Sequence, residues 1–201
     1  ARPGPSPAPT GAPFVNGAPV HTVVLAETEA EARRLAASAE PGTLVFAPAR
    51  TPLLASGLSG RAASHLAQRL RGFDVVPVQA GGSVVDVAPA PLEPGSAFGV
   101  QLISCDVSLT SIGTFTYVDG DHFVGFGHPL LDRGTVDYLT TSAYIHYVVQ
   151  SLTTPFKLGS AIAPAGALLQ DRSAGVAGRL GQAPRMVPVT VSVHDLDRNV
   201  T

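Results

Sequence analysis

Alternation of apolar and polar residues, the pattern of a half-buried β-strand, is clearest between Gly113 and Phe126. Two short runs of this kind flank Asp119-Gly120, a pair typical of a type I′ turn, in which both central residues have positive φ. The second run is followed at once by Gly127-His128-Pro129. Because a proline cannot continue a ladder of hydrogen bonds, we expect His128 to lie just past a strand end, with its ring facing a cleft.

Short apolar or alternating segments continue through the second half of the chain and predict a β-rich part, in the form of a barrel or a sandwich. In residues 186–194, valines alternate with Pro, Thr and Ser, which predicts a strand. Residues 142–152 are compatible with either a buried strand or a short helix. The remaining predicted strands are Phe98–Ser104, Gly166–Leu169 and Ser173–Leu180.

The first half has a different pattern, in which strands alternate with helices, and it predicts a small α/β subdomain. Thr28 and Ser59 stand where helix N-caps are expected. Pro41-Gly42 and Gly72 end the two helices. The strands are predicted at His21–Ala26, Thr43–Ala47 and Asp74–Val78, and the helices at Glu27–Ala39 and Gly60–Arg71.

These patterns divide the chain into three predicted parts. Residues 1–20 are rich in Pro, Gly, Ala and Ser and are expected to form a linker or tail. Residues 21–82 form the small α/β subdomain, and residues 83–201 form the β-rich domain. The expected fold class is therefore α+β, with a mainly β, barrel-like C-terminal part.

Composition narrows the classes of function. The chain has 201 residues, of which 45% are hydrophobic and 14% charged, so it contains enough apolar material for a core. A net charge of −2 gives no electrostatic reason to bind nucleic acid or an anionic membrane surface. No apolar run reaches the ~18 residues of a membrane span. The single cysteine, Cys105, excludes an intrachain disulfide and is expected to be a small buried residue.

His128 is the main candidate for chemistry, because a neutral imidazole accepts a proton near pH 7 and can act as a general base. The alternative is a turn histidine with a structural role. A serine mechanism also needs a nucleophile. Ser59 lies in Gly57-Leu58-Ser59-Gly60, which has the Gly-x-Ser-Gly spelling, although a helix N-cap is the simpler interpretation. Asp132 and Asp137 follow His128 closely and are candidates for an orienting acid.

Other polar residues have simpler interpretations. Asp119 and Asp121 flank a turn glycine, and Asp171-Arg172 could form an ion pair. The chain has no Gly-x-Gly-x-x-Gly sequence and no phosphate loop, so no cofactor is expected. A metal site is a weaker alternative, because the spacing of the possible ligands matches no standard zinc pattern. Those ligands would come from His122, His128, His146, Asp132 and Asp137.

Several separate segments along the predicted β-rich domain contain recognisable short motifs. They are Leu92–Leu102, Gly113–Asp121, Phe126–Pro129, Phe156–Gly159, Gln170–Gly178 and Met186–Val191. Together they resemble the SpoIVB-type serine peptidase family, over roughly half of the chain. The resemblance implies a fold related to the paired β-barrels of chymotrypsin-like enzymes, a protein or peptide substrate, and an extracytoplasmic place in the bacterial cell envelope. The family's catalytic histidine lies in a Gly-His motif, and His128 occupies that position.

The chain also departs from the family's pattern. The family's nucleophilic serine lies in Gly-Met-Ser-Gly-Ser-Pro, a motif that this chain lacks. In longer bacterial proteins similar to this one the serine motif lies upstream, and the linker-like start at Ala1 fits a chain cut after it. We therefore expect a portion of a serine endopeptidase that carries the histidine, is inactive alone, and has the upstream serine-bearing part as its partner. The alternative is a non-catalytic protein- or peptide-binding module of the cell envelope, which would add a strand at an open sheet edge.

Overall fold

The structure, a computed structural model, describes residues 14–15, 17–47, 50–73, 75–80, 87–150, 156–192 and 194. Contacts divide the chain into two compact units, residues 1–50 and 51–201. The sequence-based boundary between residues 82 and 83 lies elsewhere, because the strands that follow Arg50 pair with the large sheet of the second unit. No helix in these described ranges is long and apolar enough to cross a membrane.

The first unit contains a β-α-β motif, as the sequence predicts, with two parallel strands joined by a helix. The Thr28 hydroxyl accepts a hydrogen bond from the backbone N–H of Glu31 at 3.2 Å, which confirms the predicted N-cap. A short two-stranded ribbon precedes the motif, within the segment predicted to be a linker, whose residues 1–13 lie outside the described ranges. The elements are β1 (Phe14–Val15), β2 (Ala18–Pro19), β3 (Thr22–Leu25), α1 (Glu29–Ala37) and β4 (Thr43–Phe46).

The second unit begins with another β-α-β motif. Its elements are β5 (Thr51–Ser56), α2 (Gly60–Arg69) and β6 (Val75–Gln79). Strand β5 pairs in parallel with β6 and antiparallel with β8 (Ser108–Asp119), so the motif joins the large sheet. The sequence predicts no strand at β5. Ser59 occupies the predicted N-cap position before α2, but its hydroxyl makes no capping hydrogen bond.

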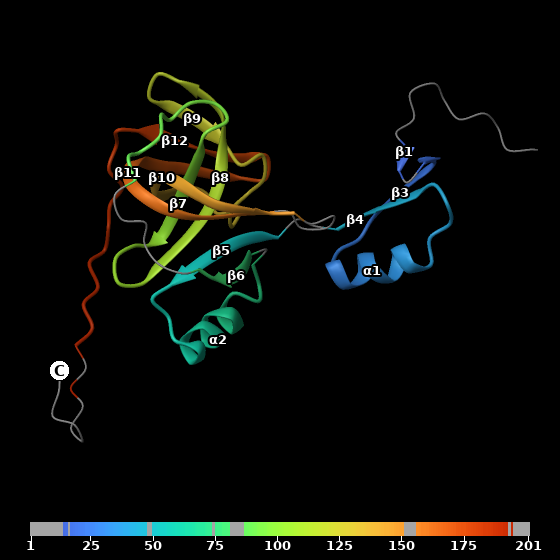
Figure 1. Cartoon of the computed structure of the whole chain (residues 1–201), viewed down its shortest axis with the longest axis horizontal. Coiled ribbons are helices and arrows are strands. Elements are labelled where there is room, and N and C mark those ends of the chain that lie inside the picture. Colours follow the sequence, from blue (N-terminus) through green and yellow to red (C-terminus); the bar gives the residue numbers. More distant parts are fainter. Residues whose placement is uncertain are drawn as a thin grey trace, which may run out of the picture. The chain divides into compact units, whose positions relative to one another are not determined.

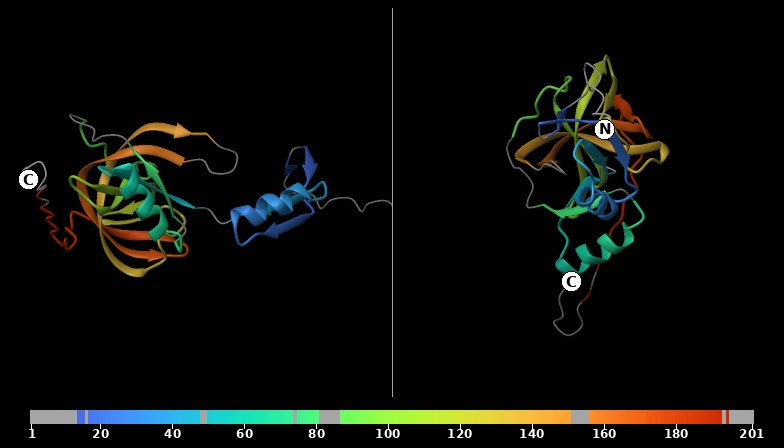
Figure 2. Two further views of the ribbon diagram at one scale, coloured as in Figure 1. Left: turned by 90° about the horizontal axis from the view of Figure 1, so that it is seen from below. Right: turned by 90° about the vertical axis from the view of Figure 1, so that its right-hand side faces the viewer.

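The strands of the second unit close into a ring of pairings. Strand β8 pairs with β7 and β9, β9 with β12, β12 with β11, β11 with β10, and β10 with β7. In Figures 1 and 2 these strands curve around a common interior. The described chain is mostly β, which confirms the predicted β-rich second half. The remaining bounds are β7 (Ala97–Ile103), β9 (His122–Gly125), β10 (Gly134–Val149), β11 (Phe156–Arg172) and β12 (Gly175–Leu180).

Phenylalanines form the centre of the core in this ring. Phe98 is fully buried, and its ring stacks on Phe115 with 4.2 Å between centroids. It meets Phe123 edge-on at 5.5 Å and Phe126 at 5.1 Å. Since burial of apolar surface is the main favourable term in folding, this cluster fixes β9 and the chain that follows it. Aliphatic side chains complete the cluster: Val100, Leu130, Leu168 and Val176.

Three details differ from the sequence-based expectations. In the β8–β9 hairpin Asp119 pairs with His122, so the loop residues are Gly120 and Asp121. Of these residues only Gly120 has positive φ, which is the pattern of a type II′ turn and not of the predicted type I′ turn. The strand predicted at residues 186–194 is wrong for residues 186–192 and 194, the described part of that segment, because they belong to no strand. Cys105 is exposed, since it lies in the turn between β7 and β8.

Candidate functional site

His128 lies in residues 126–133 between β9 and β10, which we call the histidine loop. The imidazole is partly buried. Its Nδ1 lies 2.8 Å from the carbonyl oxygen of Pro129 and 3.4 Å from Oγ1 of Thr51. A carbonyl oxygen can only accept a hydrogen bond, so the shorter contact requires the hydrogen to be on Nδ1. In a neutral imidazole this leaves Nε2 as the proton acceptor.

A buried carboxylate holds the histidine loop in place. Asp171 on β11 is fully buried. Its oxygens accept backbone N–H bonds from Leu130 at 2.7 Å, Leu131 at 2.8 Å and Arg133 at 3.3 Å. A buried charge must be paired or hydrogen-bonded, and bonds to a charged acceptor are stronger than neutral ones. Asp171 therefore fixes the backbone that directly follows His128.

The role of Asp171 differs from the ion pair that its sequence context suggests. The Arg172 guanidinium donates instead to Oε1 of Gln170, through Nε at 2.9 Å and Nη2 at 2.8 Å. An aspartate inside an apolar strand segment is a signal of buried pairing. The sequence pattern could not identify the partner, because Leu130 is 41 residues away along the chain.

Asp171 also influences Tyr138, whose ring packs against the phenylalanine core. Burial raises the pKa of the Tyr138 phenol, the negative charge of Asp171 raises it further, and the positive charge of Arg133 opposes the shift. A raised pKa means that the folded protein holds the phenol proton more tightly than the unfolded chain does. The resulting stabilisation is complete below about pH 10 and declines as the pH rises through the pKa of the folded state.

The backbone of the histidine loop has positive φ at three positions, two of which are not glycine. Phe126 and Asp132 have φ values of 66° and 52°, and Gly127 has a φ of 75°. Residues other than glycine seldom adopt positive φ, and such strain persists only where surrounding contacts enforce it, often at functional sites. Here the enforcing contacts are the packing of Phe126 on Phe98 and the bonds to Asp171.

The histidine loop also contacts the β5–α2–β6 motif. Thr51, the first residue of β5, is buried and faces Nδ1 of His128. The Arg133 guanidinium lies 4.7 Å from the centre of the Phe73 ring, which is a cation–π distance. Leu131 packs against the apolar clusters of both the ring and the motif. The site therefore combines segments that the sequence assigns to different domains.

The structure does not bring the other predicted site residues to His128. The ring of His128 faces the first residue of β5, whereas Ser59 follows the last, and a six-residue strand spans roughly 16 Å. Asp137 is engaged elsewhere, because its Oδ2 accepts the backbone N–H of Arg185 at 3.1 Å. Asp132 is exposed. In the described part of the chain no hydrogen bond or ion pair connects any of these three residues with the His128 ring.

A serine–histidine contact lies elsewhere in the sheet, and the sequence did not indicate it because its members stand on different strands. Nε2 of His146 on β10 lies 2.9 Å from Oγ of Ser160 on β11. Ser160 also lines a cavity of about 150 Å³ with uncharged residues of β5, β7 and β8. Among the described residues no carboxylate forms a hydrogen bond or ion pair with His146, so this pair lacks the orienting acid of a triad.

The weaker metal hypothesis finds no support in the geometry. Across the described ranges, no group of three or more His, Cys, Asp and Glu side chains could hold a metal ion. The side chain of His122 is instead close to Asp121, with Nδ1 2.8 Å from Oδ1.

Comparisons of this chain with family models, with curated proteins and with solved structures find no match. Function must therefore be inferred from the residues and geometry of the site.

His128→Ala should leave the fold intact and change the free energy of unfolding by less than about 1 kcal/mol, because the ring is only partly buried. Gly127→Val should cost more, about 1–3 kcal/mol, since valine is strained at a φ of 75° even where nothing lies within 4 Å of the added Cβ. Chemical denaturation of both variants measures the two losses. A larger loss in His128→Ala than in Gly127→Val would identify the histidine as a packing residue.

Proposed function

We propose that this chain is the histidine-bearing part of a serine endopeptidase of the SpoIVB type, with His128 as the general base. The nucleophilic serine is supplied by a Gly-Met-Ser-Gly-Ser-Pro segment that these 201 residues lack. The observation that carries the proposal is the bond from Nδ1–H of His128 to the Pro129 carbonyl oxygen at 2.8 Å. This bond orients the ring and leaves Nε2 to accept a proton, which is the role of the base in a serine peptidase.

The proposed chemistry assigns distinct roles to His128, to the Pro129 carbonyl and to Asp171 on β11. The serine hydroxyl attacks the peptide carbonyl carbon while Nε2 of His128 takes the hydroxyl proton, and the imidazolium then gives that proton to the leaving amine. Throughout, Nδ1–H keeps its bond to Pro129. A backbone carbonyl has only a partial negative charge, so it orients the ring but stabilises the imidazolium less than a carboxylate would. Asp171 is a positioning residue, because it holds the backbone on which the Pro129 carbonyl depends.

The proposal extends to fold, substrate and location. The ring of six paired strands would be one barrel of a chymotrypsin-like pair, and the serine-bearing segment would belong to the other part of the enzyme. The substrate would be a protein or peptide, and the enzyme would work outside the cytoplasm, in the cell envelope. These extensions rest on the resemblance of the sequence segments that surround His128.

NMR tests the base assignment directly. Long-range ¹H–¹⁵N correlation spectra of the chain, recorded where the His128 ring is neutral, should show a protonated Nδ1 and an unprotonated Nε2. Thr51→Val removes the neighbouring hydroxyl and should leave this tautomer unchanged, because the Pro129 carbonyl remains. A hydrogen on Nε2 of the neutral ring would contradict the proposal.

A fluorophosphonate probe tests the missing nucleophile. The chain alone should not be labelled, and Ser59→Ala and Ser160→Ala should behave like the parent chain. A polypeptide that also carries the upstream serine motif should be labelled, and His128→Ala should abolish that labelling while His122→Ala, a change at an exposed histidine, retains it. Labelling of the chain alone that is lost in Ser59→Ala would place the nucleophile within it and overturn the proposal.

A second candidate function is a non-catalytic module that binds a protein or peptide. One observation favours it: among the described residues, no serine hydroxyl and no carboxylate bonds the ring of His128. This function predicts that the longer polypeptide remains unlabelled by the probe although its serine motif is present.

A further inference from the structure

The last described segment has the sequence of a β-strand but no strand partner. Residues 182–192 belong to no strand, and Figure 1 draws this part of the chain, in red, as an extended segment beyond β12. Val187, Val189 and Val191 are 83%, 79% and 77% exposed. An extended segment with exposed β-branched residues and unpaired backbone groups is a template for pairing with another strand.

We propose that residues 186–192 pair antiparallel with the same residues of a second copy of the chain, about a twofold axis at Val189. In an antiparallel pair, the N–H and C=O groups of alternate residues point to the same edge of the strand. Val187, Val189 and Val191 therefore share one edge, and Pro188, which has no N–H, lies on the other. We call the edge that Val187, Val189 and Val191 share the pairing edge. With Val189 opposite Val189 of the other copy, Val187 lies opposite Val191, and every backbone N–H and C=O group on the pairing edge has a hydrogen-bond partner.

The absence of charge and the placement of the valines and Pro188 suit pairing with a second copy of the same segment. Residues 186–192 carry no charged side chain, so two copies meet without repulsion. Directly opposite residues place their side chains on the same face of the two-stranded pair. The valine side chains of both copies therefore form one apolar surface, in which cross-strand neighbours contact one another. Pro188 interrupts the outer edge of each strand, and pairing therefore stops at two copies.

The terminal edge of the large sheet suits this segment poorly. The strand order places β6 at that edge, whereas the other described strands of the sheet each have a neighbour on both sides over at least part of their length. Strand β6 carries Pro77 at its centre, and a proline protects an edge by removing a donor.

The pairing is small but its start is anchored. Seven residues from each copy bury less than the roughly 1,200 Å² of a standard protein interface, so the dimer should be reversible and dependent on concentration. The backbone N–H of Arg185 is bonded to Asp137 on β10, which attaches the segment to the ring directly before it begins. This attachment lowers the conformational entropy that pairing must remove.

Sedimentation equilibrium of the chain tests the proposal through a pair of proline variants. The parent chain should move from the mass of one copy toward that of two as its concentration rises. Val189→Pro removes an N–H from the pairing edge and should weaken dimerisation at least about tenfold. Thr190→Pro removes an N–H from the outer edge and should change it less than about twofold. Both positions are exposed, so the melting transition of the ring should be unchanged in either variant.

A cross-link provides the second test. Directly opposite residues of a hydrogen-bonded pair have Cα atoms about 5.5 Å apart, a distance that a disulfide spans. In a Cys105→Ser background, Val189→Cys should form a covalent dimer on oxidation, and Thr190→Cys should do so more slowly. Four outcomes would each overturn the proposal. Two concern the parent chain: the mass of a single copy at every concentration, or growth beyond two copies. The other two concern the variants: equal weakening of dimerisation by the two prolines, or no cross-link at position 189.

Discussion

Asp171→Asn should lower the free energy of unfolding by about 3 kcal/mol. The carboxylate accepts three backbone N–H bonds in a fully buried position. An amide keeps one acceptor oxygen, but its NH₂ group faces a second backbone donor, and the negative charge that strengthens the bonds is lost. At least one of the N–H groups of Leu130, Leu131 and Arg133 is then left without a partner. Denaturation with urea, followed by circular dichroism, measures the loss.

Asp132→Asn is the matched control, because it makes the same chemical change at an exposed aspartate within the histidine loop. Asp132 is exposed and has a φ of 52°, and asparagine tolerates positive φ as well as aspartate does. We expect its free energy of unfolding to stay within about 0.5 kcal/mol of the parent chain. Asp171→Asn should also shift the NMR signals of His128, since the loop loses its anchor, and Asp132→Asn should shift them little. Equal losses in the two variants would refute the anchoring role of Asp171.

Phe98→Ala should lower the free energy of unfolding by about 3–5 kcal/mol, the usual cost of emptying a buried aromatic site. Phe98 has no exposed surface and contacts the rings of Phe115, Phe123 and Phe126. Alanine would leave a cavity in place of the Phe98 ring, and Phe126 would lose the contact that supports its positive φ. Signals of His128, two residues further on, should therefore broaden or shift together with the loss of stability.

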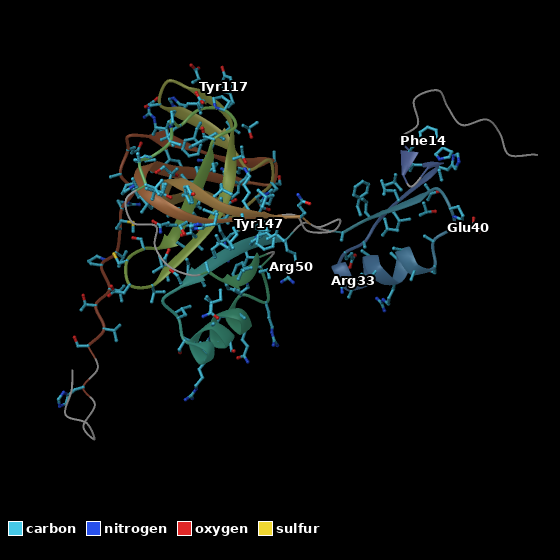
Figure 3. The ribbon with its side chains drawn as sticks, in the orientation of Figure 1. Phe14, Arg33, Glu40, Arg50, Tyr117 and Tyr147 are labelled. Carbon is cyan, nitrogen blue, oxygen red and sulfur yellow. The ribbon has the colours of Figure 1, made fainter. Side chains whose placement is uncertain are left out.

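Tyr117→Ala tests whether burial causes this effect. Tyr117 lies on β8 near the turn of the β8–β9 hairpin, where it pairs with Val124 (Figure 3), and it is 60% exposed. The expected loss is less than about 1 kcal/mol. The same denaturation experiment compares both variants. If the free energy of unfolding fell as much in Tyr117→Ala as in Phe98→Ala, burial of Phe98 inside the ring of strands would not be the cause of the stabilisation.

Local patterns predicted most elements of this protein because their signals lie in neighbouring residues. The capping threonine at position 28, the helix after Ser59 and the alternation around Gly120 each require only a few adjacent side chains. The strand at Thr51–Ser56 and the domain boundary escaped prediction for the opposite reason. Membership of β5 in the large sheet depends on pairing with β8, more than fifty residues later in the chain.

The same division holds for the candidate site. Neighbouring residues alone predict that His128 follows a strand end in a Gly-His-Pro turn, since glycine permits a bend that other residues resist and proline cannot continue a strand ladder. The folded structure was needed to show that Asp171 anchors this turn, that Thr51 faces the ring, and that Ser59 follows the far end of β5. These contacts depend on how distant strands register against one another. That register is set by the buried phenylalanine cluster and by backbone pairing, and neither can be read from residues that are neighbours in the chain.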